Sequence, residues 1–405
     1  MKHRIVIVGG GFGGVKTALE LADDNRFEIT LISSNADFRN YPVLFHVTTG
    51  GARKVASIPL AEIFDGKKVK LIIDSVTSID RQSRSVSTQA GKSFRYEALV
   101  LGLGVQTNYF GIKGLEEHSF GIKSPDEADR LKSHLHQQLC KDNRPDLNYV
   151  IIGGGPTGVE LAGELPSYID KLVRQHNLKP RKIHVDLIEA SPRLVPRMPK
   201  AISRRIARNL RKQGVKVYLK TAVQAQTADT LYVNDKPIRS HTVIWTAGVK
   251  NNTFFAEQNF QLAGNSKVRV DQFLQAENGI YVIGDNADTP YSGMAQTAIY
   301  DGVFVASNLQ RIASKQDPLP YVAKKPIYVL PAGPKWAAVL WGRIRFYGAL
   351  GWIIRGMADY IAFNDFLPWN TATKRWLALQ EEEDDCHHCS ASISKMNYLS
   401  GESDA

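Results

Sequence analysis

Residues 6–14 read VIVGGGFGG, and nearly the same letters, VIIGGGPTG, return at residues 150–158. Each copy follows a short β-branched run and precedes apolar residues with helical spacing, VKTALELA at 15–22 and VELAGEL at 159–165. A glycine turn between a strand and a helix is typical of dinucleotide binding, because it brings a pyrophosphate against free N–H groups at the helix N-terminus. Two copies predict two dinucleotide-binding units in one chain.

The first loop supplies one group of candidate ligands. Its candidate cofactor-binding residues are Gly9, Gly11, Phe12, Gly13 and Gly14. Glycine is needed there for the tight turn, for the approach of the pyrophosphate and for close packing of the helix on the strand. The next strand, EITLIS at 28–33, ends in Ser33, where an acid that binds a ribose hydroxyl is usual. A serine still forms hydrogen bonds with a hydroxyl, so Ser33 is also a candidate.

The second loop carries the acid that the first one lacks. Its glycines with the required spacing are Gly153, Gly155 and Gly158. The following strand, IHVDLIEA, ends in Glu189, which suits a 2′-hydroxyl and repels a 2′-phosphate, so NADH is favoured over NADPH. Arg193 lies four residues later and would suit a 2′-phosphate, which keeps NADPH open. Two such sites together indicate a flavin and a nicotinamide dinucleotide that exchange a hydride.

Length and composition set broader limits. A chain of 405 residues is long enough for two or three domains with cores of their own. Three cysteines are too few for a disulfide scaffold, which is consistent with a reducing compartment. The apolar run after Met1 stops at Gly9, so we expect no export signal. No window approaches the roughly 20 apolar residues of a spanning helix.

The charge is unevenly distributed along the chain. Residues 381–405 hold seven acids and one base, so the rest of the chain carries +17 although the whole carries +11. A basic protein favours anionic partners such as nucleic acid, phosphorylated cofactors or an anionic membrane leaflet. A basic surface that only confers solubility is equally compatible with these numbers.

The region 336–376 contains five of the six tryptophans of the chain. Its basic neighbours are Arg343, Arg345, Arg355, Lys374 and Arg375, and the apolar residues with helical spacing are Phe346, Leu350, Ile353, Met357 and Ile361. Aromatic and basic residues beside an apolar stripe predict an amphipathic helix that lies in a bilayer interface. Packing of the helix on the rest of the protein, or a dimer interface, are the alternatives.

Several motifs together resemble a known family. They are the first glycine loop, YEALVLGLGVQTNYFGIKGLEEH (96–118), IIGGGPTGVELAGEL (151–165), HTVIWTAGV (241–249), GIYVIGDNA (279–287) and MAQTAIYDG (294–302). The chain resembles two-dinucleotide-domain flavoproteins related to glutathione reductase and, among them, the type II NADH:quinone oxidoreductases, or alternative NADH dehydrogenases. The resemblance covers roughly residues 3–370.

This resemblance implies FAD on the first loop and NADH on the second. Further cofactor-binding candidates are Gly104, Gly248, Gly284, Asp285 and Ala295. Asp285 would bind the ribityl chain, and Gln296 would lie near the flavin ring and the quinone. Glu160 would lie near the junction of nicotinamide, flavin and quinone. Tyr300 stands where family members often have a second glutamine, so the quinone contact is remodelled or the acceptor differs.

Each candidate has a plainer interpretation. Gln296 and Tyr300 are four residues apart and share one helix face, which would also suit an ordinary surface helix. Glu160 and Glu164 form another such pair, which is often simply a solvated face. Asp285 after GIYVIG would otherwise be a turn carboxylate.

Cysteine usage narrows the electron acceptor. A disulfide reductase needs a cysteine pair beside the flavin, and no pair occurs before residue 386. Cys140 alone cannot form the relay of a sulfide:quinone oxidoreductase. The stretch CHHC at 386–389 supplies one CxxC pair without a second, so we expect no metal site.

These observations predict an α/β fold with two Rossmann-like domains, for FAD and NADH, and a carboxy-terminal amphipathic helical segment. The FAD domain is expected at 1–115 and 251–330, the NADH domain at 116–250, the membrane-associating segment at 331–380 and a disordered acidic tail at 381–405.

The predicted function is a non-proton-pumping NADH dehydrogenase of electron transport, a peripheral membrane protein at the cytoplasmic face of the cell membrane. Its expected partners are menaquinone or ubiquinone and an anionic membrane surface, with a homodimer as a further option and no nucleic acid. A soluble NAD(P)H-dependent flavoprotein reductase for a ferredoxin-like acceptor is the alternative. A non-catalytic flavin-binding scaffold of the apoptosis-inducing-factor kind is the third hypothesis.

Overall fold

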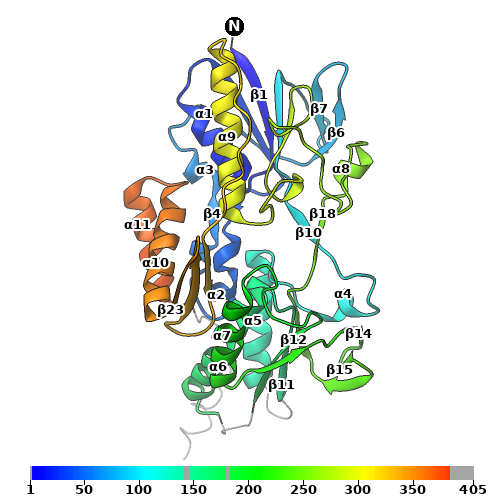
Figure 1. The fold of residues 1–405 in the computed structure, drawn as a ribbon, viewed down its shortest axis with the longest axis vertical. Coiled ribbons are helices and arrows are strands. Elements are labelled where there is room, and N and C mark those ends of the chain that lie inside the picture. The colour runs from blue at the N-terminus through cyan, green and yellow to red at the C-terminus, as the bar shows by residue number, and fades with distance from the viewer. Residues whose placement is uncertain (1, 141–145, 179–182, 384–405) are drawn as a thin grey trace, which may run out of the picture.

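The structure is a computed structural model that describes residues 2–140, 146–178 and 183–383. Two sheets built mainly of parallel strands lie in opposite halves of an elongated molecule, and a carboxy-terminal segment packs beside them (Figure 1). This arrangement confirms the predicted α/β fold with two Rossmann-like units.

The first sheet has six strands in the order β19-β20-β9-β1-β2-β5. They are β1 (His3–Val8), β2 (Phe27–Ser33), β5 (Val69–Ile73), β9 (Ala98–Leu101), β19 (Gln275–Glu277) and β20 (Ile280–Val282). All neighbouring pairs are parallel except β19 and β20. Its central strands are continuous apolar runs, as expected when helices cover a sheet. Helices α1 (Phe12–Ala22) and α9 (Ala295–Ala313) pack against each other beside it.

The second sheet has four parallel strands in the order β13-β12-β11-β17. They are β11 (Asn148–Ile152), β12 (His184–Glu189), β13 (Lys216–Leu219) and β17 (Thr242–Trp245). The helices of this half are α5 (Pro125–Cys140), α6 (Pro156–Gln175) and α7 (Lys200–Lys212). The whole unit is inserted in sequence between β9 and β19 of the first sheet.

Smaller elements complete the two halves. The strands are β3 (Asp37–Arg39), β4 (Ser57–Pro59), β6 (Val76–Asp80), β7 (Ser85–Thr88), β8 (Ser93–Arg95), β14 (Val223–Gln226), β15 (Thr230–Val233) and β16 (Lys236–Arg239). The helices are α2 (Leu44–Thr48), α3 (Leu60–Ile63), α4 (Leu115–His118) and α8 (Phe254–Glu257), with 3₁₀ turns η1 (Tyr41–Val43), η2 (Arg53–Val55) and η3 (Gly284–Asn286).

The chain crosses between the two halves twice, and the two crossing segments lie side by side. They are β10 (Val105–Thr107) and β18 (Val249–Asn251), which pair in antiparallel fashion at the junction. Directly after β10 the chain packs on the half that contains the second sheet. Tyr109 stacks there on Trp245 of β17, with ring centroids 6.1 Å apart.

The carboxy-terminal segment is only partly helical. It begins with a three-stranded antiparallel sheet of β21 (Tyr328–Pro331), β22 (Ala337–Trp341) and β23 (Ile344–Gly348). It continues with α10 (Ala349–Asn364), α11 (Trp369–Leu377) and η4 (Ala378–Gln380). The sheet was not predicted, although Gly342, with a φ of 60°, supplies the left-handed turn that a two-residue hairpin requires.

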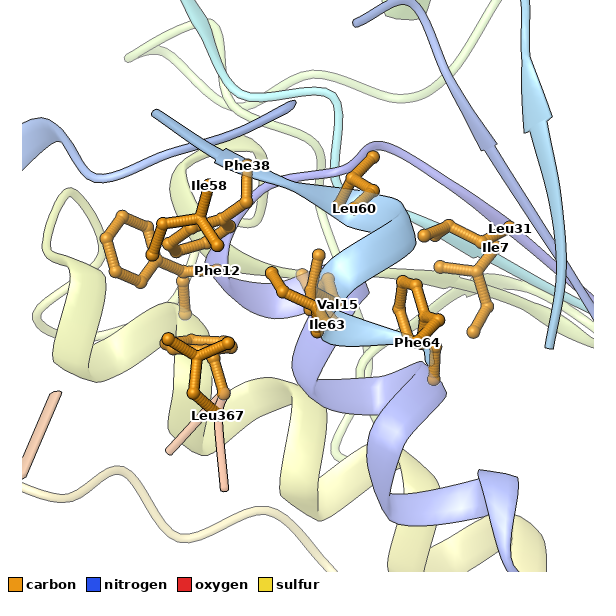
Figure 2. Close-up of a cluster of buried hydrophobic side chains, with 14 of the residues drawn as sticks. Ile7, Phe12, Val15, Leu31, Phe38, Ile58, Leu60, Ile63, Phe64 and Leu367 are labelled. Atoms are coloured by element: carbon orange, nitrogen blue, oxygen red, sulfur yellow. The ribbon is translucent and has the colours of Figure 1, made fainter. Parts of the chain in front are cut away.

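The end of this segment is anchored in the core of the first half. The Phe12 ring packs edge-on against Phe38 at 4.8 Å and against Phe366, which follows α10, at 5.7 Å between ring centroids. Figure 2 shows Phe12, Phe38 and Leu367 in this cluster. The Phe12 side chain therefore serves the core, and only its backbone remains available to a cofactor.

Residues 381–383 differ from the expected disordered tail. The Glu383 N–H donates to the Gly50 carbonyl at 2.8 Å, and the Glu383 carboxylate accepts the Arg53 backbone N–H at 2.8 Å. Glu382 forms an ion pair with Lys171 of α6 at 2.7 Å. The CHHC stretch at 386–389 lies outside the described residues.

Candidate functional site

The two glycine loops have the same local geometry. A Cβ on Gly14 would lie 2.0 Å from the Gly9 carbonyl oxygen, and a Cβ on Gly158 would lie 1.9 Å from that of Gly153. Gly9 and Gly153 have φ values of 118° and 112°, which other residues rarely adopt. Helices α1 and α6 thus approach the ends of β1 and β11 as closely as a nucleotide-binding turn requires.

The middle glycine of each loop borders open space. A Cβ on Gly11 or on Gly155 would meet no protein atom within 4 Å. Each of these residues is the N-cap of its helix. The N–H groups of Phe12, Gly13 and Gly14 in the first loop, and of Thr157 and Gly158 in the second, have no partner within their helix and lie beside this open space, where a pyrophosphate would accept hydrogen bonds from them. Both glycine loops therefore have the open space and the free N–H groups that a dinucleotide-binding loop, here called a cradle, requires.

Glu189 closes the second cradle. Its carboxylate accepts the backbone N–H groups of Gly154 and Ser191, each at 2.6 Å. A carboxylate fixed beside the loop favours a ribose hydroxyl and repels a 2′-phosphate. Arg193 does not offset this charge, because its guanidinium donates to the Met198 and Pro196 carbonyls. The geometry therefore favours NADH.

Ser33 is the last residue of β2, and its predicted contact with the FAD ribose stays a prediction. It is buried, and its hydroxyl donates to the Asn35 carbonyl at 2.7 Å while accepting the Asn35 N–H at 3.2 Å. Asn35 and Arg39 instead line a cavity of about 110 Å³ just beyond β2, together with Arg53. The sequence analysis missed these two side chains, although polar residues directly after a parallel strand were the available signal.

Asp285 lies in η3, directly after β20. Burial raises the pKa of its carboxyl group, while Lys267, Lys123 and Arg197 lower it. Burial in turn lowers the pKa values of Lys267 and Lys123, and Asp285 is the first group that opposes this change in each. Because Arg197 and Lys123 belong to the other half of the molecule, Asp285 lies where the two halves meet. A carboxylate at this place suits the hydroxyl groups of a polar chain, and the nearby cations suit phosphates, so the turn is compatible with a flavin dinucleotide.

Two candidate glycines lie at the crossing between the halves. The Gly104 N–H donates to the Asn286 side-chain oxygen at 2.9 Å, and the Asn286 amide donates to the Gly104 carbonyl at 2.7 Å. A Cβ on Gly248 would lie 2.3 Å from the Phe110 ring. Gly248 thus allows close packing at the junction, whereas a Cβ on Gly104 would meet no protein atom within 4 Å. Gly104 is instead hydrogen-bonded to Asn286, the residue that follows Asp285.

Asp301, which the sequence analysis missed, supports the same turn. It is fully buried in α9, accepts the Gly284 N–H at 2.9 Å and accepts the Tyr321 hydroxyl at 2.6 Å. Burial raises its pKa to about 6, against the opposing effect of both hydrogen bonds. An acid inside the otherwise uncharged run AIYDGVFVA was the available signal. Gly284 is held by Asp301 and carries Asp285 next to it.

The first turn of α9 contacts the linker that leads to β21. Ala295 is the first helical residue. The Gln296 side-chain oxygen accepts the Ile327 N–H at 2.9 Å, and the Lys324 ammonium lies 4.2 Å from the centre of the Tyr300 ring. Gln296 and Tyr300 therefore share one face, as expected, and this face is directed toward residues 321–327.

Glu160 is buried rather than part of a solvated pair. It is 9% exposed, and its carboxylate lies 3.5 Å from the Arg355 guanidinium of α10. Arg355 also pairs with Asp359 at 2.7 Å and donates to the Pro42 carbonyl at 3.2 Å. Burial outweighs the attraction of Arg355 and raises the pKa of Glu160 to about 8. Burial likewise raises the pKa of Glu164 to about 7.

Arg355 is therefore not one of the bases beside the apolar stripe. The opposite face of α10 is the exposed one, where Leu350, Ile353, Met357 and Ile361 are 53% to 60% exposed. Trp341 and Ile344 of the β22–β23 hairpin are also exposed. We call these six residues the apolar face. No helix in the part of the chain that the structure describes has the length and apolar character to cross a bilayer.

Comparison with known proteins agrees with a fold that contains two dinucleotide-binding units. Residues 3–302 match the family described as pyridine nucleotide-disulphide oxidoreductase. The type II NADH:quinone oxidoreductase of Staphylococcus saprophyticus is 27% identical over 340 residues, which cover 78% of this chain and 84% of that protein.

Solved structures show the same fold. The structure of NDH2 from Plasmodium falciparum in complex with NADH has a TM-score of 0.83 at 17% identity and covers 94% of this chain and 98% of that one. The sulfide:quinone oxidoreductase of Aquifex aeolicus has a TM-score of 0.75 at 20% identity, with 90% and 91% covered. At these identities the structural likeness supports the fold.

Proposed function

Because the chain belongs to the pyridine nucleotide-disulphide oxidoreductase family, we propose that it is a type II NADH:quinone oxidoreductase that uses FAD. The observation that carries this assignment is the pair of open glycine cradles at Gly11 and Gly155, of which the second has an acid, Glu189, fixed beside it. A flavin dinucleotide on the first cradle and NADH on the second account for both.

The residues of the chain mainly position the two cofactors. The first turn of α1 and Asp285 would hold FAD, and the first turn of α6 and Glu189 would hold NADH. When bound, FAD supplies the hydride acceptor for NADH and the donor of two electrons to a quinone. Cys140 is the only cysteine before residue 386, so no dithiol relay competes for these electrons.

Three candidates from the sequence lie toward the carboxy-terminal segment. Gln296 and Tyr300 face residues 321–327, and Glu160 meets α10 through Arg355. Quinone reduction consumes protons, and a carboxyl group whose pKa is about 8 still holds its proton at pH 7. We assign Glu160 the role of proton donor to the quinone, and Gln296 and Tyr300 the role of quinone contacts.

The apolar face gives this protein access to a quinone dissolved in a bilayer. Four long apolar side chains on one side of α10 are more than half exposed, with Trp341 beside them. Such a helix lies in the interface of the bilayer rather than across it. Menaquinone or ubiquinone is the expected acceptor. The protein would sit at the cytoplasmic face of the cell membrane, where NADH is available. A homodimer is the alternative arrangement that would cover the apolar face.

An anaerobic titration tests the function. Purified protein that contains FAD is mixed with NADH, and the flavin absorbance near 450 nm is expected to fall and then return on addition of a quinone analogue. Flavin that bleaches with NADH but is reoxidised only by a ferredoxin-like protein would establish the soluble reductase instead. Flavin that does not bleach would favour the non-catalytic scaffold.

A further inference from the structure

Helix α7 carries a dense positive charge without acids. Its sequence is KAISRRIARNLRK, and its exposed cations are Lys200, Arg204, Arg205, Arg208, Arg211 and Lys212. Among the residues that the structure describes, no ion pair involves any of these six. Some exposed cations elsewhere have acidic partners, for example Arg26 with Asp24 and Arg81 with Glu277. Others, such as Lys92 and Arg95, have no ion pair among the described residues, but α7 gathers six such cations on one helix. This concentration of positive charge suits an anionic partner outside the chain.

A cavity of about 150 Å³ lies on this helix. Its lining residues are Arg205, Arg208, Asn209, Lys212 and Trp336. The Asn209 amide donates to the Ala332 carbonyl at 2.8 Å and so fixes α7 against the turn that bears Trp336. A single water molecule needs roughly 10 to 15 Å³ by the same measure, so the cavity has room for a larger polar group. Three cations around one cavity, with an indole at its wall, suit a phosphate group.

The cavity adjoins the apolar face. The Arg205 guanidinium carbon lies 5.3 Å from the centre of the Tyr347 ring, and that ring lies 6.3 Å from Trp336. Tyr347 is in β23, and α10 begins two residues later, with Leu350 as its second residue. Figure 1 shows β23 between α7 and α10. Ile344 and Arg345, also in β23, are both exposed.

We propose that the cavity on α7 binds the phosphate of an anionic phospholipid headgroup, beside the place where the apolar face enters the bilayer. Cations and aromatic rings at the border of an apolar surface are typical of proteins that lie at the interface of an anionic bilayer. This inference rests on the proposed membrane attachment. It adds a specific lipid class and the residues that recognise it.

Vesicle flotation tests the proposal with holoenzyme. Binding of the wild type and of an Arg205→Gln/Arg208→Gln variant is compared on phosphatidylcholine vesicles with and without phosphatidylglycerol. Removal of two cations near an anionic surface is expected to weaken binding to the mixed vesicles about thirtyfold. Binding to pure phosphatidylcholine should not change, because the apolar face is intact. At high salt the wild type should bind vesicles with and without phosphatidylglycerol equally well, since salt screens the attraction between charges.

A matched control removes two exposed cations far from α7. Lys92→Gln/Arg95→Gln changes the net charge equally, at and beside β8 of the first half. It should keep the affinity for mixed vesicles within about twofold, since screening reduces the effect of distant charges. An equal loss in both variants would show a general effect of net charge and overturn the site. Flavin content and thermal unfolding confirm that each variant is folded.

Titration with soluble ligands identifies the source of the phosphate. Soluble short-chain phosphatidylglycerol should quench Trp336 fluorescence in the wild type and not in the Arg205→Gln/Arg208→Gln variant, while inorganic phosphate at equal concentration should quench it little. Equal quenching by inorganic phosphate, or stronger quenching by a short DNA duplex, would overturn the lipid assignment. Quinone reduction is measured separately, with a water-soluble analogue and no vesicles. Its failure would overturn the proposed function and leave the lipid result standing.

Discussion

The Arg355 guanidinium of α10 lies 3.5 Å from the Glu160 carboxylate of α6, and both side chains are buried. This contact joins the carboxy-terminal segment to the helix that begins at the second glycine loop. Arg355 also reaches the first half of the molecule through the Pro42 carbonyl at 3.2 Å. One side chain therefore connects three parts of the fold at the place where we locate proton delivery.

Replacement of Arg355 by methionine should destabilise the protein. The variant leaves the half-buried Asp359 carboxylate without its cation, so the free energy of unfolding should fall by about 3 kcal/mol. A combined Arg355→Met/Asp359→Asn variant should recover part of this loss, since the acid that lost its partner is then neutral. Denaturant unfolding measures both. Arg343→Met, at an exposed hairpin position, is the control and should change little.

Glu160 should make stability depend on pH. Its pKa rises from the ordinary 4.5 to about 8 on folding, so the folded state holds a proton that the unfolded state releases. The stabilising effect of that proton is complete below pH 4.5 and is lost as the pH rises through 8. Relative to Glu160→Gln, the wild type should lose on the order of 3 kcal/mol between pH 5 and pH 9. Parallel pH profiles would contradict the buried placement of this acid.

The sequence was most informative where the chemistry is local. The glycine loops and the acid at Glu189 follow from spacing alone, because turn, helix start and strand end lie within one short stretch of chain. The role of Ser33 stays a prediction, and its hydrogen bond to Asn35 is a contact that a strand pattern does not reveal.

Contacts between residues far apart in the chain could not be predicted from the sequence. The stripe on α10 was recognised by its period, but the same period could not show that Arg355 faces inward toward a residue nearly 200 positions earlier. Likewise, the hydrogen bonds of Asp301 to Gly284 and Tyr321 cross separate elements. An acid inside an apolar run predicts that a buried partner exists, but it does not predict which residue that partner is.

Asp301 should hold the flavin-binding turn in place. Asp301→Ala leaves the Gly284 N–H and the Tyr321 hydroxyl unpaired in the interior, which should cost about 2 to 3 kcal/mol of stability. FAD should then be lost more readily on dialysis, since Asp285 follows the freed residue. Tyr321→Phe removes only one of the two contacts and should retain FAD. An alanine variant that keeps FAD as firmly as the wild type would count against this role.

Gly155→Ala should separate folding from NADH binding. A Cβ at this position meets no protein atom within 4 Å, so thermal unfolding of the free protein should be unchanged within about 0.5 kcal/mol. The methyl group would occupy the space that a pyrophosphate needs, so KM for NADH should rise at least about tenfold. Gly264→Ala, also without neighbours, is the control and should affect neither quantity. An unchanged KM would place NADH elsewhere.

The first residues of the acidic tail should act as a weak, salt-sensitive link between the two halves. Glu381 pairs with Lys54 of the first half, and Glu382 pairs with Lys171 of the second. Because these pairs are exposed, Glu381→Gln/Glu382→Gln should lower the free energy of unfolding by at most about 1 kcal/mol in low salt. The difference should disappear near 1 M salt, where screening is nearly complete. Glu116→Gln/Glu117→Gln removes two exposed acids from α4 and serves as the matched control. A loss that persists in high salt would mean that the link depends on the backbone hydrogen bonds of the neighbouring Glu383 rather than on charge.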